Sequence, residues 1–191
     1  MTRILGIDQS LSKCAFVQMV DGDVENLHLS KTGSSKVKTK RKDTSYYDTL
    51  PEQIHRICKD LRSQVEYFKP DYITFESLSY GSSGDASRNL AELHGAMRET
   101  LICIGFSGKI IEYAPTSLKS YAHQFLPEYL KWDGFTKAGK PKKVKMDKKM
   151  VVAAVREICG KDYLSEYNYS TGLDDLSDAT FLARKTWEEY A

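Results

Sequence analysis

The order of strand-like and helix-like segments is the feature that most limits how this chain can fold. Residues 50–68 form the clearest amphipathic pattern, because apolar residues recur at steps of three and four. Pro51 suits the first turn of a helix, and the Lys-Pro-Asp sequence at 69–71 ends it. An apolar run at 72–75 follows at once and predicts a strand. A helix that leads directly into a buried strand favours an α/β fold with parallel pairing.

The segments on either side complete one domain that covers residues 1–191. The first of them are three strands joined by short turns, which indicates an antiparallel meander. We expect a mixed five-stranded sheet, three antiparallel strands and then two parallel ones, flanked by helices. The other predicted elements are strands at 3–9, 13–20, 25–31 and 109–113 and helices at 86–104, 116–125, 146–159 and 176–190.

Basic residues gather in two polar stretches that we expect to be loops, at about 32–49 and 131–146. The runs 31–42 and 137–149 hold 13 of the 28 lysines and arginines, which leaves the rest of the chain acidic. This distribution suits a polyanion that is held at two places, although solvated lysine-rich loops would look the same. The candidate DNA-binding residues are Lys36, Lys38, Lys40, Arg41, Lys42, Lys140, Lys142, Lys143 and Lys145.

The remaining bulk properties suggest a reducing compartment. The sequence contains no run of eighteen apolar residues, so we expect no membrane span. A strand-like run begins so early in the chain that we expect no signal peptide before it. The cysteines (Cys14, Cys58, Cys103 and Cys159) form no CxxC pair, and each has apolar neighbours. We expect free thiols at core positions in a cytoplasmic protein, of viral or organellar origin as a further hypothesis.

Acidic residues occur in three contexts where an unpaired charge would be costly. Asp8 lies in an apolar opening run, Glu76 ends another, and Asp175 and Asp178 stand three apart before the last helical stretch. A carboxylate at the end of a buried strand costs several kcal/mol unless something compensates it. A divalent cation with hard oxygen ligands could compensate all of them together. Asp174 is a weaker ligand candidate, because it would point about 100° away from Asp175 on a helix, and it could instead cap that helix.

Several segments, in the same order along the chain, resemble the RuvC family of Holliday junction resolvases. Residues 6–11 (GIDQSL) are similar to the family's GIDPGL opening, and 73–76 to its second acidic strand. Residues 113–119 (YAPTSLK) are similar to its Y-x-P-x-x-x-K segment, 146–151 to its K-x-x-V helix, and 175–179 (DLSDA) to its terminal D-x-x-D-A. The resemblance covers most of the chain and implies an RNase H-like fold.

The family resemblance also implies an activity and its residues. It implies an endodeoxyribonuclease that resolves four-way junctions with two Mg²⁺ ions, for which Mn²⁺ would substitute, held by Asp8, Glu76, Asp175 and Asp178. Lys119 and Lys148 match family lysines near the scissile phosphate. Where the family often carries an aromatic wedge this chain has Ser79, and Tyr80 follows as a candidate DNA contact. Paired incision further implies a homodimer, for which the helix at 86–104 is a candidate interface that could equally be buried in the monomer.

Two alternatives remain open at this stage. One is a broader nuclease acting on branches and flaps, or an RNase H acting on hybrids. The other is a non-catalytic nucleic-acid-binding module that keeps the RNase H-like frame, against which the complete set of acids argues.

Overall fold

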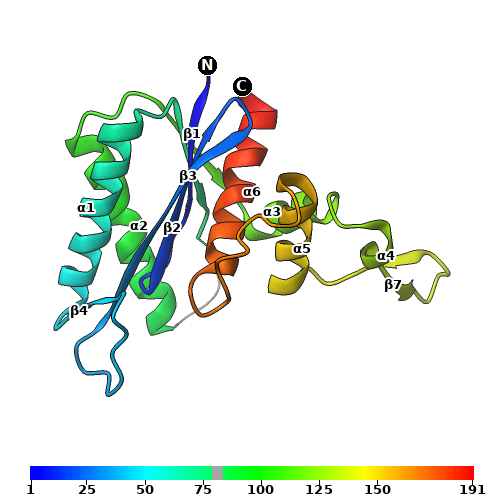
Figure 1. The fold of residues 1–191 in the computed structure, drawn as a ribbon, viewed down its shortest axis with the longest axis horizontal. Helices are drawn as coiled ribbons and strands as arrows, with labels where there is room; N and C mark the ends of the chain where they lie inside the picture. The colour runs from blue at the N-terminus through cyan, green and yellow to red at the C-terminus, as the bar shows by residue number, and fades with distance from the viewer. Residues whose placement is uncertain (79–83) are drawn as a thin grey trace.

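A six-stranded mixed sheet forms the centre of the molecule, with helices on both faces (Figure 1). The computed structural model describes residues 1–78 and 84–191. The strand order is β4-β3-β2-β1-β5-β6, in which β1 pairs antiparallel with β2 and parallel with β5. The strands are β1 (Arg3–Asp8), β2 (Lys13–Val20), β3 (Asp23–Ser34), β4 (Ser45–Tyr47), β5 (Tyr72–Glu76) and β6 (Lys109–Tyr113).

The expectation of five strands is wrong by one strand at the edge of the sheet. The short strand β4 pairs in parallel with the end of β3, which itself continues to Ser34. Both segments lie in the stretch 32–49, which the sequence predicts as a loop. β4 has only three residues, all of them partly buried, so no alternation of apolar and polar residues marks it in the sequence.

The second basic stretch is also more ordered than a loop. Within 131–146, β7 (Trp132–Phe135) and β8 (Pro141–Lys143) pair antiparallel, directly after the one-turn helix α4 (Glu128–Lys131). The hairpin projects from the body of the protein (Figure 1), and every residue of its two strands is exposed. We refer to residues 132–143 as the basic hairpin. Because none of its strand residues is buried, its sequence carries no apolar pattern that would reveal strands.

The longer helices lie close to their predicted positions. α1 (Leu50–Phe68) matches its prediction and starts with a capping box, in which Thr49 Oγ1 accepts a hydrogen bond from the Glu52 N–H and the Glu52 carboxylate accepts one from the Thr49 N–H. α6 begins three residues earlier than predicted, after Gly172 with φ 112°. α6 spans Leu173–Tyr190, and the other three helices are α2 (Asp85–Cys103), α3 (Pro115–His123) and α5 (Lys148–Cys159).

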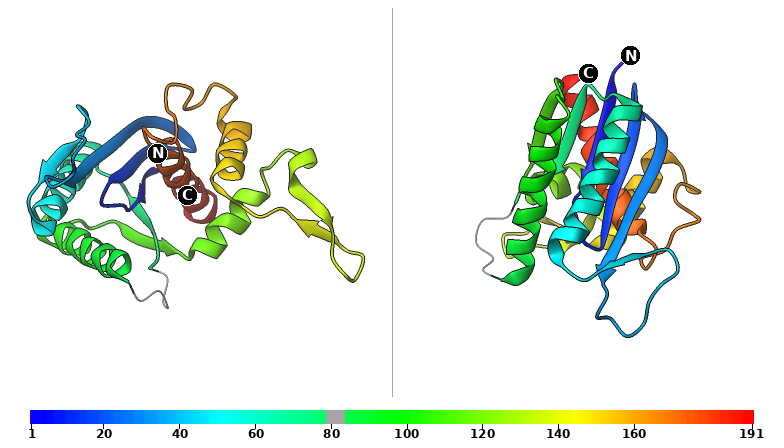
Figure 2. Two further views of the ribbon diagram at one scale, coloured as in Figure 1. Left: turned by 90° about the horizontal axis from the view of Figure 1, so that it is seen from below. Right: turned by 90° about the vertical axis from the view of Figure 1, so that its left-hand side faces the viewer.

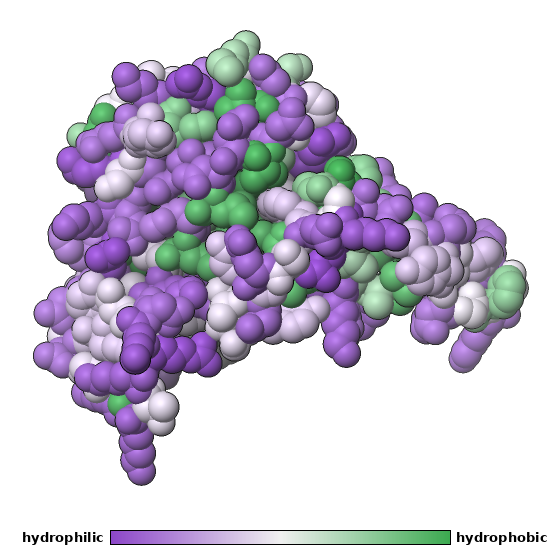
Figure 3. Space-filling model, viewed as in Figure 1, coloured by the Kyte–Doolittle hydropathy of each residue, from purple (hydrophilic) through white to green (hydrophobic). Residues whose placement is uncertain are grey.

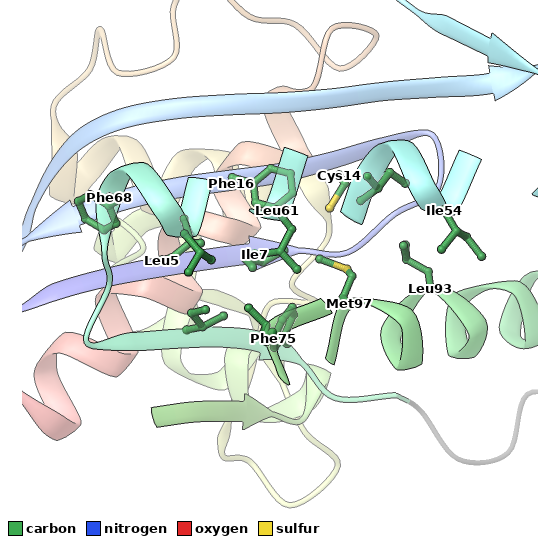
Figure 4. Close-up of a cluster of buried hydrophobic side chains, with 14 residues drawn as sticks. Leu5, Ile7, Cys14, Phe16, Ile54, Leu61, Phe68, Phe75, Leu93 and Met97 are labelled. Atoms are coloured by element: carbon green, nitrogen blue, oxygen red, sulfur yellow. The ribbon is translucent and has the colours of Figure 1, made fainter. Parts of the chain in front are cut away.

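Two helical layers enclose the sheet (Figure 2). α1 and α2 cover one face, and α6 covers the other with α3 and α5 beside it. Figure 4 shows the first core, where Leu61 of α1 and Met97 of α2 meet Ile7 and Phe75 of the sheet. Met97 and Leu93 are completely buried there, so this side of α2, the helix named as a candidate dimer interface, belongs to the core of the monomer.

Strand alternation decides which acids meet α6. Gly6 and Asp8 lie on the face of β1 that α6 covers, together with Ile4 of that core. A Cβ atom on Gly6 would lie 2.2 Å from the carbonyl oxygen of Ala179 and 2.9 Å from Cβ of Ala183. Glycine therefore lets α6 pack directly on the backbone of β1, two residues before Asp8.

The cysteines are free thiols, as predicted, but not all of them are core residues. Cys14 is buried and Cys58 partly buried, whereas Cys103 and Cys159 are exposed, so the expected core positions of the last two are wrong. Within the described part of the chain, no helix has the length and apolar character needed to span a membrane.

Candidate active site

Asp8 and Glu76 lie next to each other at one end of the sheet. Asp8 ends β1 and Glu76 ends β5, and these strands pair in parallel with Ile7 opposite Phe75. Ile4 of β1 belongs to the core under α6, and Tyr72 of β5 packs against that core, each of them four residues before the acid that ends its strand. The two carboxyl groups therefore point to the same face of the sheet, as strand periodicity requires.

The first turns of α6 bring two further acids to this place. Asp175 and Asp178 are three positions apart, so they share one face of the helix. Asp178 directly precedes Ala179, whose carbonyl group lies over Gly6, and this contact holds Asp178 close to Asp8. The four carboxylates that the sequence singles out thus come together from three elements that are far apart in the chain.

Electrostatic coupling between these acids is strong. Burial, followed by the charges of Asp178, Asp175, Glu76 and Asp174, raises the pKa of Asp8 well above its usual value. Burial, followed by the charge of Glu76, raises the pKa of Asp178 to about 7. Burial also raises the pKa values of Glu76 and Asp175. Such mutual effects require carboxyl groups that lie near one another in a poorly solvated place.

Asp174 behaves differently, because it is paired with lysine. Burial opposes its ionisation, but hydrogen bonds from Lys148 and from its own backbone N–H, with the charge of Lys13, lower its pKa. Asp174 is not the N-cap that the sequence suggested, since Gly172 takes that position. Lys148 Nζ donates a hydrogen bond to Asp174 Oδ2, while most of the Lys148 side chain stays exposed. Lys148 therefore lies beside the acids, with its charge engaged by Asp174.

Lys119, the other predicted lysine, lies near a different pair of acids. It belongs to α3 and is exposed. Its charge acts on both Glu76 and Asp178 and opposes the rise in their pKa values. Lys119 is thus a cation near two of the four acids that remains open to an incoming phosphate.

Lys13 is a site residue that sequence reasoning missed. Its Nζ atom lies 2.9 Å from Asp175 Oδ2 and 3.8 Å from Asp174 Oδ1, and it donates a 2.9 Å hydrogen bond to the Tyr169 carbonyl. The signal was present in the strand pattern. Lys13 has the same parity along β2 as Ala15 and the other residues that pack against α6.

Gln9 forms a buried link behind the acids. Its Nε2 donates to the carbonyl oxygen of Glu76 at 2.9 Å, and its Oε1 lies 2.7 Å from His94 Nδ1. The other ring nitrogen of His94 lies 3.3 Å from Glu112 Oε1, which also accepts from Arg98 at 2.7 Å. His94 is therefore a packing residue of α2 that also braces the end of β5 through Gln9.

The predicted DNA-binding side chains lie on the surface. The lysines of 36–42 and 140–145 are exposed or partly exposed, and Lys142 pairs with Asp133 at 2.9 Å. We refer to residues 31–49 and 131–149 as the first and second basic segments. Arg41 donates a hydrogen bond to the Ser170 carbonyl at 2.9 Å, which joins the first basic segment to the loop before α6. Tyr80, the candidate wedge, lies outside the described residues.

The carboxylate oxygens have the chemistry that Mg²⁺ prefers. Asp175 Oδ2 and Asp174 Oδ1 are buried and, despite the nearby lysine, have no hydrogen bond of good geometry. Across residues 1–78 and 84–191, no group of three or more His, Cys, Asp or Glu side chains already stands in a metal-binding arrangement. The donor set thus fits a divalent cation in its chemistry, and its side chains would have to move to close around one.

A mixed sheet with acids on its first strand, on the parallel strand beside it and on the last helix is an RNase H-like architecture. The sequence matches no family model and no curated relative. Comparison of the fold is more informative, because the solved structures that it resembles include several Holliday junction resolvases.

RuvC of Thermus thermophilus, in complex with a Holliday junction substrate, superposes with a TM-score of 0.64 at 16% identity, over 96% of this chain and 92% of that one. The yeast mitochondrial Holliday junction resolvase gives 0.62 at 14% identity, over 99% and 81%. The fowlpox virus Holliday junction resolvase gives 0.50 at 14% identity, over 98% and 99%. The chain therefore has a RuvC-like resolvase fold, and at these identities the likeness concerns the fold.

Proposed function

We propose that this protein is a metal-dependent endonuclease that resolves four-way DNA junctions. The observation that carries the proposal is the convergence of Asp8, Glu76, Asp175 and Asp178 on one face of a RuvC-like sheet. Carboxylates that repel one another in a poorly solvated place are stabilised when a cation binds among them. A site of this kind at a sheet rim suits hydrolysis of a phosphodiester.

The chain's own residues would divide the work in a definite way. Asp8, Glu76, Asp175 and Asp178 would hold two Mg²⁺ ions, or Mn²⁺ in their place. Bound magnesium would activate the attacking water and neutralise charge on the phosphate. Burial and the charge of Glu76 raise the pKa of Asp178 to about 7, so this carboxyl group would give up its remaining proton when a cation binds. Lys119 is free to contact the phosphate that is cut.

The two basic segments would position the substrate. Their exposed lysines and Arg41 lie outside the acid cluster and can contact phosphates of the DNA arms. Contacts of this kind fix the orientation of a duplex and carry no base code. Junction selectivity then depends on arms that reach both segments at the same time.

A cleavage assay with a panel of substrates tests the proposal. Labelled four-way junctions, flaps, Y-forms and RNA–DNA hybrids are incubated with Mg²⁺ or Mn²⁺, and Asp8→Asn is the matched inactive control. We expect symmetric nicks in four-way junctions alone. Equal cutting of flaps or hybrids would establish a broader nuclease instead. Tight junction binding with no cutting in either metal would establish a binding module.

A further inference from the structure

Lys13 occupies one side of the acid cluster, and its position divides the four carboxylates into two sets. Its ammonium group contacts Asp175 and lies near Asp174, while Lys148 takes the other oxygen of Asp174. No lysine or arginine among the described residues forms an ion pair with Asp8, Glu76 or Asp178. Among the described residues, direct ion pairs are therefore confined to the first turn of α6, and Lys119 acts on Glu76 and Asp178 only through its charge at longer range.

The surroundings of Lys13 hold its side chain in this position. The Tyr169 carbonyl accepts a hydrogen bond from Nζ, and only 22% of the side chain is exposed. A divalent cation that used Asp175 as a ligand would meet the Lys13 ammonium in the same place. Two positive charges within a few Å of each other repel strongly in a poorly solvated site, so only one can stay.

A groove beside Lys13 could hold a second anionic partner for its side chain. Lys13 lines this groove together with Lys31, Arg41, Tyr46 and Tyr169. A DNA phosphate in this groove would be attracted by three basic side chains. Lys13 could exchange the Asp175 carboxylate for that phosphate without losing an ionic partner.

We propose that Lys13 is an internal substitute for one divalent cation, and that DNA releases it. Without DNA, Lys13 stays on Asp175, and the protein binds one cation firmly through Asp8, Glu76 and Asp178. When a DNA phosphate draws Lys13 into the groove, Asp175 becomes free and the second cation binds. DNA binding and second-cation binding then strengthen each other, because such coupling is reciprocal. This inference rests on the proposed metal-dependent function.

Counting bound Mn²⁺ in the absence of DNA tests the substitution directly. Electron paramagnetic resonance is used on the wild type, Lys13→Met, Lys13→Gln and Lys31→Met. Lys31 is the matched control, because it stands opposite Lys13 in the β2–β3 register and pairs with Asp43 instead of the acid cluster. We expect one firmly bound ion in the wild type and in Lys31→Met. In both Lys13 variants we expect a second ion, bound at least about tenfold more tightly than in the wild type.

Two other outcomes have different meanings. Two equally tight ions in the DNA-free wild type, unchanged in the folded Lys13 variants, would overturn the substitution and leave the proposed nuclease intact. Absence of Mn²⁺ binding in every protein would overturn the metal-dependent function as well. Thermal unfolding identifies which variants are folded, and either Lys13 variant alone is sufficient.

Junction binding in EDTA tests the release of Lys13 without any metal. Asp175→Asn should bind an immobile four-way junction several-fold more tightly than the wild type, because Lys13 is then free for phosphate. A general decrease in negative charge would also tighten binding, so the double variant Lys13→Met/Asp175→Asn separates the two causes. We expect the gain to vanish in the double variant when compared with Lys13→Met. A gain that persists there would contradict the phosphate exchange.

Discussion

At the scale of one residue, the buried carboxyl group of Asp178 lowers the stability of the folded protein. It is mostly buried beside other acids, and burial followed by the charge of Glu76 raises its pKa to about 7. We predict that Asp178→Asn abolishes metal-dependent cleavage and raises the free energy of unfolding in EDTA by on the order of 1 kcal/mol. Chemical denaturation and a junction assay measure the two effects. Asp162→Asn, at an exposed position, should change neither.

The same carboxyl group predicts how stability depends on pH without metal. Its pKa rises from 3.8 in the unfolded chain to about 7 in the folded protein, so the folded state holds the proton more tightly. The contribution of Asp178 to stability is therefore present at low pH and is lost as pH rises from about 4 to about 7.

Denaturation of the wild type and Asp178→Asn at several pH values measures this contribution. We expect the difference in unfolding free energy to grow in favour of the variant as pH rises, by at most about 1.4 kcal/mol per pH unit. A difference that stays constant between about pH 4.5 and 7.5 would show that Asp178 ionises normally.

At the scale of elements, the packing of α6 on β1 sets the position of the acids. A Cβ on Gly6 would meet the Ala179 carbonyl at 2.2 Å, so Gly6→Ala has to push the helix outward. We predict that stability falls by about 1–3 kcal/mol, as for other overpacked cores, and that Mn²⁺ binding weakens. Gly95→Ala is the control, because Gly95 has open space around it in α2 and alanine there should stabilise the helix. Equal stability of both variants would contradict this account of the packing.

The basic hairpin is a separate unit at this scale. Its strands are exposed and pair with each other while they project away from the body of the protein. We predict that replacing Lys140, Lys142 and Lys143 by Gln leaves thermal stability unchanged and weakens junction binding. The slope of log affinity against log salt should fall by about 0.9 for each phosphate that the variant no longer neutralises. Fluorescence anisotropy at several salt concentrations measures that slope, and an unchanged slope would place the hairpin outside the DNA interface.

At the scale of the whole molecule, the proposed function needs two active sites. We predict that the protein forms a homodimer, and that mixing it with an excess of Asp8→Asn yields junctions nicked on one strand only. Light scattering measures the mass, and denaturing gels separate single from paired nicks. The outer surface of α2 is still available for such an interface, since Leu93 and Met97 face the core and Ile102 is 72% exposed. A monomer that makes paired nicks would contradict the prediction.

The surface of the whole molecule shows why the basic segments stand out. In Figure 3 the exposed face is mainly hydrophilic, and the apolar residues gather near the middle of this view. The two basic segments project from the body, at the lower left and at the right of Figure 1. Long-range attraction of DNA would therefore depend on the extremities of the protein, which accords with its small net charge of +2.

Sequence predicted the fold well wherever one side of an element is buried. The bounds of α1 follow from its periodic apolar face, and Asp8, Glu76, Asp175 and Asp178 stand out because acids are rare beside buried runs. β4 and the basic hairpin were missed because neither buries an apolar face. Lys13 was missed because its role depends on register: only pairing of β1 with β2, and packing of α6 on both, places an ordinary strand lysine beside Asp175.

The amide of Gln9 fastens the ends of β1 and β5 to each other through the Glu76 carbonyl. The spacing between the first two acids is therefore secured by the pairing of β1 with β5 and by a buried side chain. Loops beyond this fastening can lengthen, shorten or change sequence while Asp8 and Glu76 keep their distance. If the proposed nuclease activity holds, descendants of this chain could thus acquire new preferences for DNA shape by altering those loops alone while they keep the acids in place.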